Sequence, residues 1–229
     1  MEQNELKTLM KLFFKPHPWH GISPGPAFPA ELSEFIEQVP TDTVKYEVDK
    51  VSGYLKLDRP QKFSSQPPCL YGFVPQTYCG RRVGDYCAKI TGNPDIKGDG
   101  DPIDICVLSE RTISHGDLLV TCVPIGGIRM LDSNEADDKI IAVMKNDAVF
   151  GGISDVTGLP EELVDRLCHY FLSYKDLPSN TKARRVEIES VYSRPEALKE
   201  LQYSLDDNEE QFNNPSQRIL ELIAHLTSR

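Results

Sequence analysis

The sequence has no long hydrophobic run, no Cys-x-x-Cys pair and no run of basic residues. A membrane-spanning helix needs about 18 apolar residues in succession, so the first absence argues against a membrane protein. The apolar patch at residues 9–14 is short and is interrupted by Lys11, unlike the apolar region of a signal peptide. We therefore predict a cytoplasmic protein that does not bind membranes.

The missing cysteine pairs also limit the chemistry. A structural zinc site usually depends on closely paired ligands, and Cys79 and Cys87 lie in one segment without a second pair. A chain of 229 residues can bury a core without disulfides, and free thiols are the default in the cytoplasm. We expect free thiols at all six cysteines: Cys69, Cys79, Cys87, Cys106, Cys122 and Cys168.

Basic residues are outnumbered, with 25 Lys and Arg against 35 Asp and Glu, which gives a formal net charge of −10. A protein that binds nucleic acid usually carries a basic face. Here the adjacent arginines form two isolated pairs, Arg81-Arg82 and Arg184-Arg185, which we expect to be solvated. The sequence therefore predicts no nucleic-acid partner.

Strand patterns dominate from Val44 onward. Residues 44–49 and 54–58 alternate apolar and polar side chains on either side of a Ser52-Gly53 turn, which predicts a β-hairpin. Because side chains alternate along a strand, Lys45 and Glu47 should point the same way. Further strands are expected at residues 103–108, 118–124, 127–131, 139–144 and 185–192.

Helix patterns come late in the chain. Residues 160–174 and 216–227 carry apolar side chains at helical spacing. Strands followed by helices favour an α+β fold built on a compact barrel or sheet. We predict a single domain over residues 1–229 with three appended parts: an extended, proline-rich N-terminal arm (1–36), a long loop (79–98) and a helical C-terminal tail (193–229).

The segment Asp99-Gly100-Asp101-Pro102-Ile103-Asp104 places three carboxylates within six residues. Like charges this close repel one another unless a cation neutralises them. Oxygen ligands favour hard ions such as Mg²⁺, Mn²⁺ or Ca²⁺. A second acidic cluster, Asp132 with Asp137-Asp138, also follows a predicted strand. The two clusters could meet around several ions, although solvated acidic turns remain an alternative.

Basic and phenolic side chains accompany these carboxylates: Lys45, Arg59, Tyr71, Lys139, Tyr174 and Lys175. Together with hard metal ions, such groups suit a polyphosphate, because Arg binds phosphate oxygens bidentately and Lys adds positive charge.

At these residues the chain resembles the soluble family I inorganic pyrophosphatases, from about Lys45 to Leu177. The most specific match is the Asp-x-Asp-Pro-x-Asp motif at residues 99–104. The supporting matches are Lys45–Lys50, Asp58-Arg59, Tyr71-Gly72, Asp132–Lys139 and Tyr174-Lys175. The resemblance implies a five-stranded OB-like β-barrel with flanking helices, Mg²⁺-dependent hydrolysis of pyrophosphate with Mn²⁺ as a possible substitute, and a homo-oligomer.

The resemblance also implies a role for each matching residue. Asp101 would be the general base for the attacking water, and Glu47 would support the site. The implied metal ligands are Asp99, Asp104, Asp132 and Asp137, with Glu37 as a further outer ligand. The implied phosphate contacts are Lys45, Arg59, Tyr71, Lys139, Tyr174 and Lys175.

Three alternatives stay open at the level of sequence. A Ca²⁺-binding module would use Glu110, the twelfth residue counted from Asp99, but Asp104 stands where an EF-hand loop needs glycine. A Mg²⁺-dependent phosphohydrolase could act on another polyphosphate or a nucleotide, although the chain has no Walker loop. The third alternative is a non-catalytic relative. The presence of all the expected acidic and basic residues argues against it.

Overall fold

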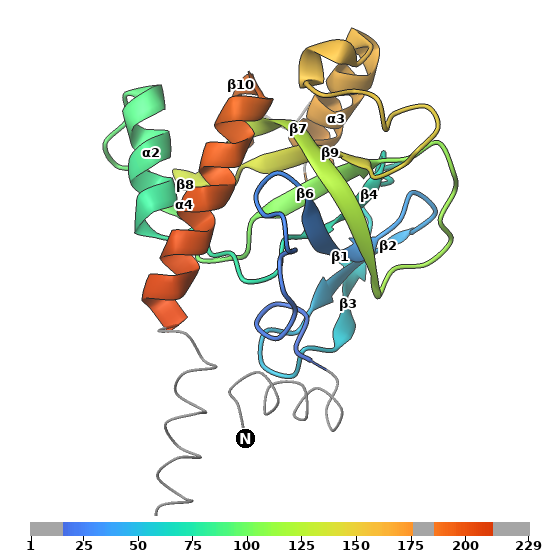
Figure 1. The fold of residues 1–229 in the computed structure, drawn as a ribbon, viewed down its shortest axis with the longest axis horizontal. Coiled ribbons are helices and arrows are strands. Elements are labelled where there is room, and N and C mark those ends of the chain that lie inside the picture. Colours follow the sequence, from blue (N-terminus) through green and yellow to red (C-terminus); the bar gives the residue numbers. More distant parts are fainter. Residues whose placement is uncertain (1–15, 176–185, 213–229) are drawn as a thin grey trace, which may run out of the picture.

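Five strands close into a ring at the centre of the molecule (Figure 1). They pair in the order β1-β4-β6-β9-β7, and β7 pairs back with β1. The ring strands are β1 (Leu32–Gln38), β4 (Leu70–Phe73), β6 (Asp104–Leu108), β7 (Leu118–Asp132) and β9 (Lys139–Met144). This computed structural model describes residues 16–175 and 186–212. The predicted α+β class and five-stranded ring are confirmed.

The other strands extend the ring or flank it. β2 (Val44–Val48) and β3 (Leu55–Pro60) form the predicted hairpin. β5 (Lys97–Gly98) pairs with β8 (Glu135–Ala136), and β10 (Val186–Ser193) pairs with the second half of β7.

Helices cover two sides of the ring. α2 (Arg81–Thr91) and α4 (Arg194–Phe212) stand next to each other at one side, and α3 (Glu161–Ser173) lies apart from them (Figure 1). A short 3₁₀ helix, η1 (Val156–Gly158), precedes α3. The acidic residues Glu161 and Glu162 lie in the first turn of α3, where the helix dipole favours negative charge. The helix predicted for residues 160–174 is therefore confirmed.

Three sequence predictions need correction. Residues 79–98 are not one long loop, because they contain α2 and β5. The N-terminal arm does not extend to residue 36, because β1 begins at Leu32 and belongs to the ring. The strands predicted at 118–124 and 127–131 are one continuous strand, β7, with an irregular register between Pro124 and Gly126.

Within the predicted C-terminal tail, residues Arg194–Phe212 form α4. The second helix predicted there, at residues 216–227, lies outside the described residues.

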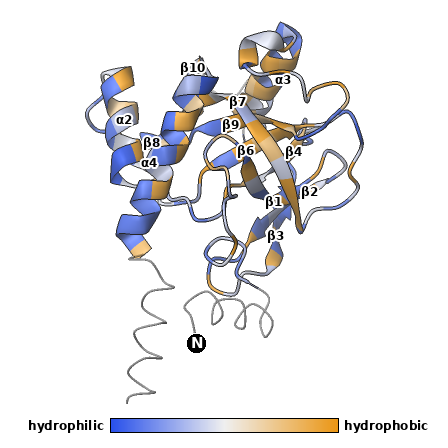
Figure 2. Ribbon diagram, in the orientation of Figure 1, coloured by the Kyte–Doolittle hydropathy of each residue, from blue (hydrophilic) through white to orange (hydrophobic). Residues whose placement is uncertain are grey.

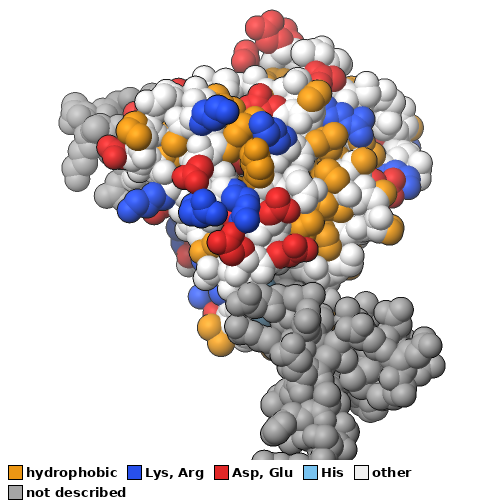
Figure 3. Space-filling view, turned by 60° about the vertical axis from the view of Figure 1, so that its left-hand side comes forward, with side chains coloured by type: hydrophobic (Ala, Val, Ile, Leu, Met, Phe, Trp, Pro, Cys, Tyr) orange, Lys and Arg blue, Asp and Glu red, His pale blue; other side chains and the backbone are white. Residues whose placement is uncertain are grey.

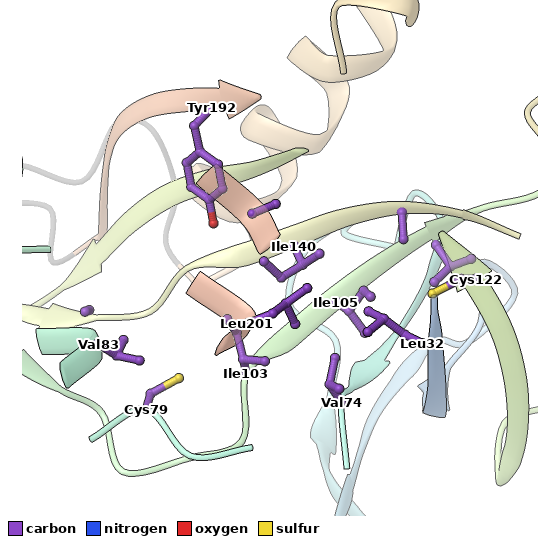
Figure 4. Packing of buried hydrophobic residues seen from close by; sticks show 14 of the residues in the cluster. Leu32, Val74, Cys79, Val83, Ile103, Ile105, Cys122, Ile140, Tyr192 and Leu201 are labelled. Carbon is purple, nitrogen blue, oxygen red and sulfur yellow. The ribbon is translucent and has the colours of Figure 1, made fainter. Parts of the chain in front are cut away.

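The main hydrophobic core joins the ring to α2 and α4. Ile103, Ile105 and Ile140 point toward Leu201 of α4, and Val83 of α2 lies near them (Figure 4). Hydrophobic residues concentrate in the ring strands, whereas α2 and α4 carry many hydrophilic residues (Figure 2). Within the described residues all six cysteines are free, as expected, and no helix there is long and apolar enough to cross a membrane.

Candidate active site

A pocket of about 250 Å³ opens where several ring strands begin or end. It brings together twelve of the thirteen residues that the sequence predicted for the site, the exception being Arg59. The pocket is lined by Glu37, Lys45, Glu47, Tyr71, Asp99, Asp101, Asp104, Asp132, Glu135, Asp137, Lys139, Tyr174 and Lys175.

Strand pairing explains why the two acidic clusters meet. Asp104 begins β6 and Lys139 begins β9, and these two residues are direct partners in the parallel β6–β9 ladder. Asp132 ends β7, the other neighbour of β9. The ends of three adjacent strands therefore bring Asp104 beside Asp132 and Lys139, which lie 28 and 35 positions later in the sequence.

The loop that carries Asp99 and Asp101 is held by backbone hydrogen bonds. Gly100 has a φ of +78°, a conformation that favours glycine. The N–H of Asp101 donates to Asp99 Oδ1 at 2.9 Å. The N–H of Cys79 donates to the carbonyl of Asp101 at 2.7 Å, and the N–H of Gly100 donates to the carbonyl of Cys79 at 3.0 Å. This loop is thus anchored to the chain segment that leads into α2.

Each lysine of the pocket lies against carboxylates. Lys139 Nζ lies 2.5 Å from Asp104 Oδ2 and also contacts Asp137. Lys175 Nζ lies 2.5 Å from Asp132 Oδ2. Lys45 Nζ lies 3.0 Å from Glu47 Oε1, which confirms that these two side chains share one face of the hairpin.

Burial and repulsion disturb the titration of the acidic groups. Burial, reinforced by the charge of Asp137, raises the pKa of Asp99 to about 8. Burial also raises the pKa of Glu37 to about 8, although its Oε1 accepts a hydrogen bond from the N–H of Val48 at 2.6 Å. Burial alone would lower the pKa of Lys139, but Asp104 and Asp137 hold it well above its usual value. The excess of carboxylates over lysines therefore disfavours ionisation of Asp99 and Glu37.

The phenol of Tyr71 contacts the carboxylate of Asp104. Burial, with the charge of Asp104, raises the pKa of Tyr71 well above its usual value, so the phenol stays protonated and acts as a donor. The ring of Tyr174 stacks on that of Tyr170, with ring centroids 5.1 Å apart. Both phenols that were predicted to contact phosphate thus have fixed positions at the pocket.

The donor set of the pocket fits hard metal ions. Eight carboxylates line it against three lysines, and it contains neither histidine nor cysteine. Within residues 16–175 and 186–212, no three Asp, Glu, His or Cys side chains stand close enough together to enclose an ion. The ammonium of Lys139 contacts both Asp104 and Asp137, so it lies between these two carboxylates.

Arg59 and Lys50 are the main differences between the predicted and observed site. Arg59 pairs with Lys45 in the hairpin register, but its guanidinium contacts Asp58 and it does not line the pocket. Lys50 was not predicted, yet its ammonium contacts the carboxylate of Asp101. Lys50 follows Asp49 within the matched Lys45–Lys50 motif, so its position in that motif was the signal that could have identified it.

Glu135 was also missed. It lies in β8, between Asp132 and Asp137, and only its place in the acidic segment indicated that it could face the pocket.

The ring and its pocket of carboxylates and lysines define an enzyme that acts on phosphate groups. The family model for inorganic pyrophosphatase matches residues 35–209. The chain is 48% identical over 194 residues to the inorganic pyrophosphatase of Chlamydia trachomatis serovar D, covering 83% of this chain and 93% of that protein. It is 31% identical to soluble inorganic pyrophosphatase 5 of Arabidopsis thaliana, covering 90% of this chain and 85% of that protein.

Solved structures agree with this match. The inorganic pyrophosphatase of Thermus thermophilus superposes with a TM-score of 0.68 at 28% identity, covering 82% of this chain and 97% of that one. The protein described here belongs to the inorganic pyrophosphatase family, whose members hydrolyse pyrophosphate.

Proposed function

We propose that this chain hydrolyses pyrophosphate to two phosphates with Mg²⁺ as its metal, and that Asp101 is the general base. The observation that carries the proposal is the meeting of both acidic clusters with three lysines in one pocket. An excess of carboxylates repels a free polyanion, so the substrate must arrive with cations that the carboxylates can bind. Mn²⁺, another hard ion with oxygen ligands, should substitute for Mg²⁺.

The proposed metal ligands are Asp99, Asp104, Asp132 and Asp137, with Glu37 as an outer ligand. When bound, Mg²⁺ lowers the pKa of water and offsets the negative charge of the phosphate oxygens. Asp99 supports this assignment, because burial and the charge of Asp137 raise the pKa of its carboxyl, and a cation beside it would relieve this repulsion. Glu47, which contacts Lys45, has a supporting role.

Side chains of the protein activate the water and bind the phosphate groups. Asp101 orients the attacking water and accepts its proton, while the water oxygen bonds to one phosphorus and the bridging P–O bond breaks. Both phosphate groups carry negative charge, which Lys45, Lys139 and Lys175 stabilise at the pocket wall. Tyr71 and Tyr174 donate hydrogen bonds to phosphate oxygens, and Arg59 must leave Asp58 to join them.

A phosphate-release assay tests the proposal. The chain should release two phosphates per pyrophosphate with Mg²⁺, much less phosphate from ATP or tripolyphosphate, and none after EDTA treatment. Preferred release from ATP or tripolyphosphate would instead support the broader phosphohydrolase. Release from none of the three would leave the Ca²⁺-binding module or a non-catalytic relative.

We also propose that the chain forms a homo-oligomer. Light scattering would then give a multiple of the 25.8 kDa chain mass, and a mass of one chain would contradict it. The cytoplasmic location stays a prediction.

A further inference from the structure

A buried arginine, Arg129, joins helix α4 to Asp138, which stands between the pocket residues Asp137 and Lys139. The side chain of Arg129, in β7, is 0% exposed. Its Nη1 donates to Glu196 Oε1 at 2.8 Å, and its Nη2 donates to Glu200 Oε2 at 3.3 Å; both glutamates belong to α4. The same Nη2 donates to Asp138 Oδ2 at 3.2 Å. Arg129 therefore ties α4 to the residue that follows Asp137.

Asp138 faces away from the pocket, while its neighbours face into it. Asp137 and Lys139 line the pocket, whereas the side chain of Asp138 is 1% exposed and turned toward Arg129. Its Oδ1 accepts a hydrogen bond from the N–H of Met130 at 3.2 Å. The N–H of Asp137 donates to the carbonyl of Met130 at 2.9 Å. Hydrogen bonds to Met130 and Arg129, outside the pocket, thus hold the backbone that carries Asp137 and Lys139.

The C-terminal half of α4 contacts the start of α2. The carboxylate of Asp207 in α4 is almost wholly buried and accepts hydrogen bonds from the N–H groups at the start of α2. The distances are 3.1 Å to Gly80, 2.9 Å to Arg82 and 3.1 Å to Val83. Gly80 has no side chain that could cap the helix, so a residue 127 positions away satisfies these donors.

Two hydrogen bonds extend this contact to the pocket. Cys79, directly before Gly80, donates to the carbonyl of Asp101 and accepts from the N–H of Gly100. In addition, the N–H of Tyr78 donates to the carbonyl of Ser204 in α4 at 2.8 Å. The loop that carries Asp99 and Asp101 is therefore held by the C-terminal half of α4.

Besides packing against the hydrophobic core, α4 takes part in buried polar contacts. On the side of the molecule where α2 and α4 come forward, acidic and basic side chains lie interspersed at the surface (Figure 3). Arg129, Glu200 and Asp207, by contrast, are buried beneath it, where an unpaired charge would be costly. Each of these buried groups contacts a segment that leads directly to proposed metal ligands.

We propose that α4 acts as a brace that fixes the two acidic segments relative to each other, with Asp138 and Asp207 as positioning residues for Mg²⁺ binding. The inference rests on the proposed function, since it assumes that these segments hold the metal. Neither residue touches the pocket. Asp138 and Asp207 would act indirectly, because metal affinity depends on how firmly the residues around the metal ligands hold those ligands in place.

Mg²⁺ titration calorimetry without substrate tests the proposal. Asp207→Ala and Asp138→Ala should each raise the Mg²⁺ dissociation constant about tenfold, as loss of groups behind metal ligands commonly does. Asp138→Ala should still fold, because Glu196 and Glu200 continue to pair with Arg129. Asp207→Asn keeps an oxygen that accepts the N–H groups of α2, so it should restore affinity to within about threefold of wild type.

Asp206→Ala is the matched control. Asp206 neighbours Asp207 in α4, but its carboxylate binds Gln202 on the same helix at 2.8 Å. It should leave Mg²⁺ affinity unchanged. Unchanged affinity in both Asp207→Ala and Asp138→Ala, each folded by circular dichroism, would overturn the brace, as would an equal loss in Asp206→Ala. Phosphate release by the wild type is measured separately, so a failure of the proposed function shows there and not in this comparison.

Discussion

The ammonium of Lys139 lies 2.5 Å from the carboxylate of Asp104, and the two residues are direct partners in the β6–β9 ladder. The register of the ring therefore fixes this pair, and a one-residue slip would turn both side chains out of the pocket. Lys139 is almost wholly buried and also contacts Asp137, so it stays charged. A fixed positive charge among carboxylates is suited to stabilising charge on a reacting phosphate.

Lys139→Met should lower kcat for pyrophosphate about 100-fold at saturating Mg²⁺, because a preorganised charge at the phosphate is lost. Lys89→Met is the control, since Lys89 lies in the exposed last turn of α2. Steady-state phosphate release checks both variants. A folded Lys139→Met protein with activity within threefold of wild type would exclude Lys139 from the reaction.

Gly98→Ala should disturb the site through backbone contact. A Cβ at Gly98 would lie 2.1 Å from the carbonyl oxygen of Cys79 and 2.4 Å from that of Gly80, and no side chain can move to relieve this contact. We expect a loss of about 1–3 kcal/mol in the free energy of unfolding and weaker Mg²⁺ binding, because Asp99 follows directly. Urea unfolding and Mg²⁺ titration measure the two effects.

Gly152→Ala provides the comparison, because a Cβ there meets nothing within 4 Å. If both alanine variants unfold at the same urea concentration, the close approach of Gly98 to Cys79 has no energetic importance.

Glu34 should make stability depend on pH. It is completely buried in β1 near the thiol of Cys122, and burial raises its pKa well above the usual value. The folded protein therefore keeps the proton at pH values at which the unfolded chain has begun to release it. Stability is fully present below the unfolded pKa of about 4.5 and falls by about 1.4 kcal/mol per pH unit as pH rises toward the folded pKa.

Glu34→Gln removes this titration while keeping the shape of the side chain. As pH rises above the unfolded pKa of about 4.5, its free energy of unfolding should increase relative to that of the wild type, by at most about 1.4 kcal/mol per pH unit. Urea unfolding at several pH values, without Mg²⁺, measures the difference. Parallel curves for the two proteins would show that Glu34 is ionised in the folded state.

Local patterns predicted the elements whose causes are local. The hairpin of β2 and β3 has an alternating pattern around a turn, and α3 has helical spacing with acidic residues in its first turn. The start of α2 lacked such a signal, because its first N–H groups are capped by Asp207. Only three residues of α2 are buried, Val83, Gly84 and Cys87, and one of them is a glycine. A helix with a distant cap and a narrow apolar stripe is easily mistaken for a loop.

Most residues that line the candidate site could be predicted from the sequence. Its residues belong to short motifs whose chemistry is visible in the sequence, so twelve of them could be named in advance. The contacts outside the pocket could not be predicted, because they join residues that meet only when the chain folds, namely Arg129 with Asp138 and Gly80 with Asp207. In the same way, the sequence predicted two strands, at residues 118–124 and 127–131, but pairing with β9 continues across the gap between them.

Pyrophosphate turnover by Asp101→Asn, measured together with Mg²⁺ binding by the same protein, tests the central claim most directly. If Asp101 accepts the proton of the attacking water in a Mg²⁺ site made by its neighbours, kcat should fall at least about 100-fold while the Mg²⁺ dissociation constant stays within about threefold of wild type. Turnover like that of the wild type would contradict this account.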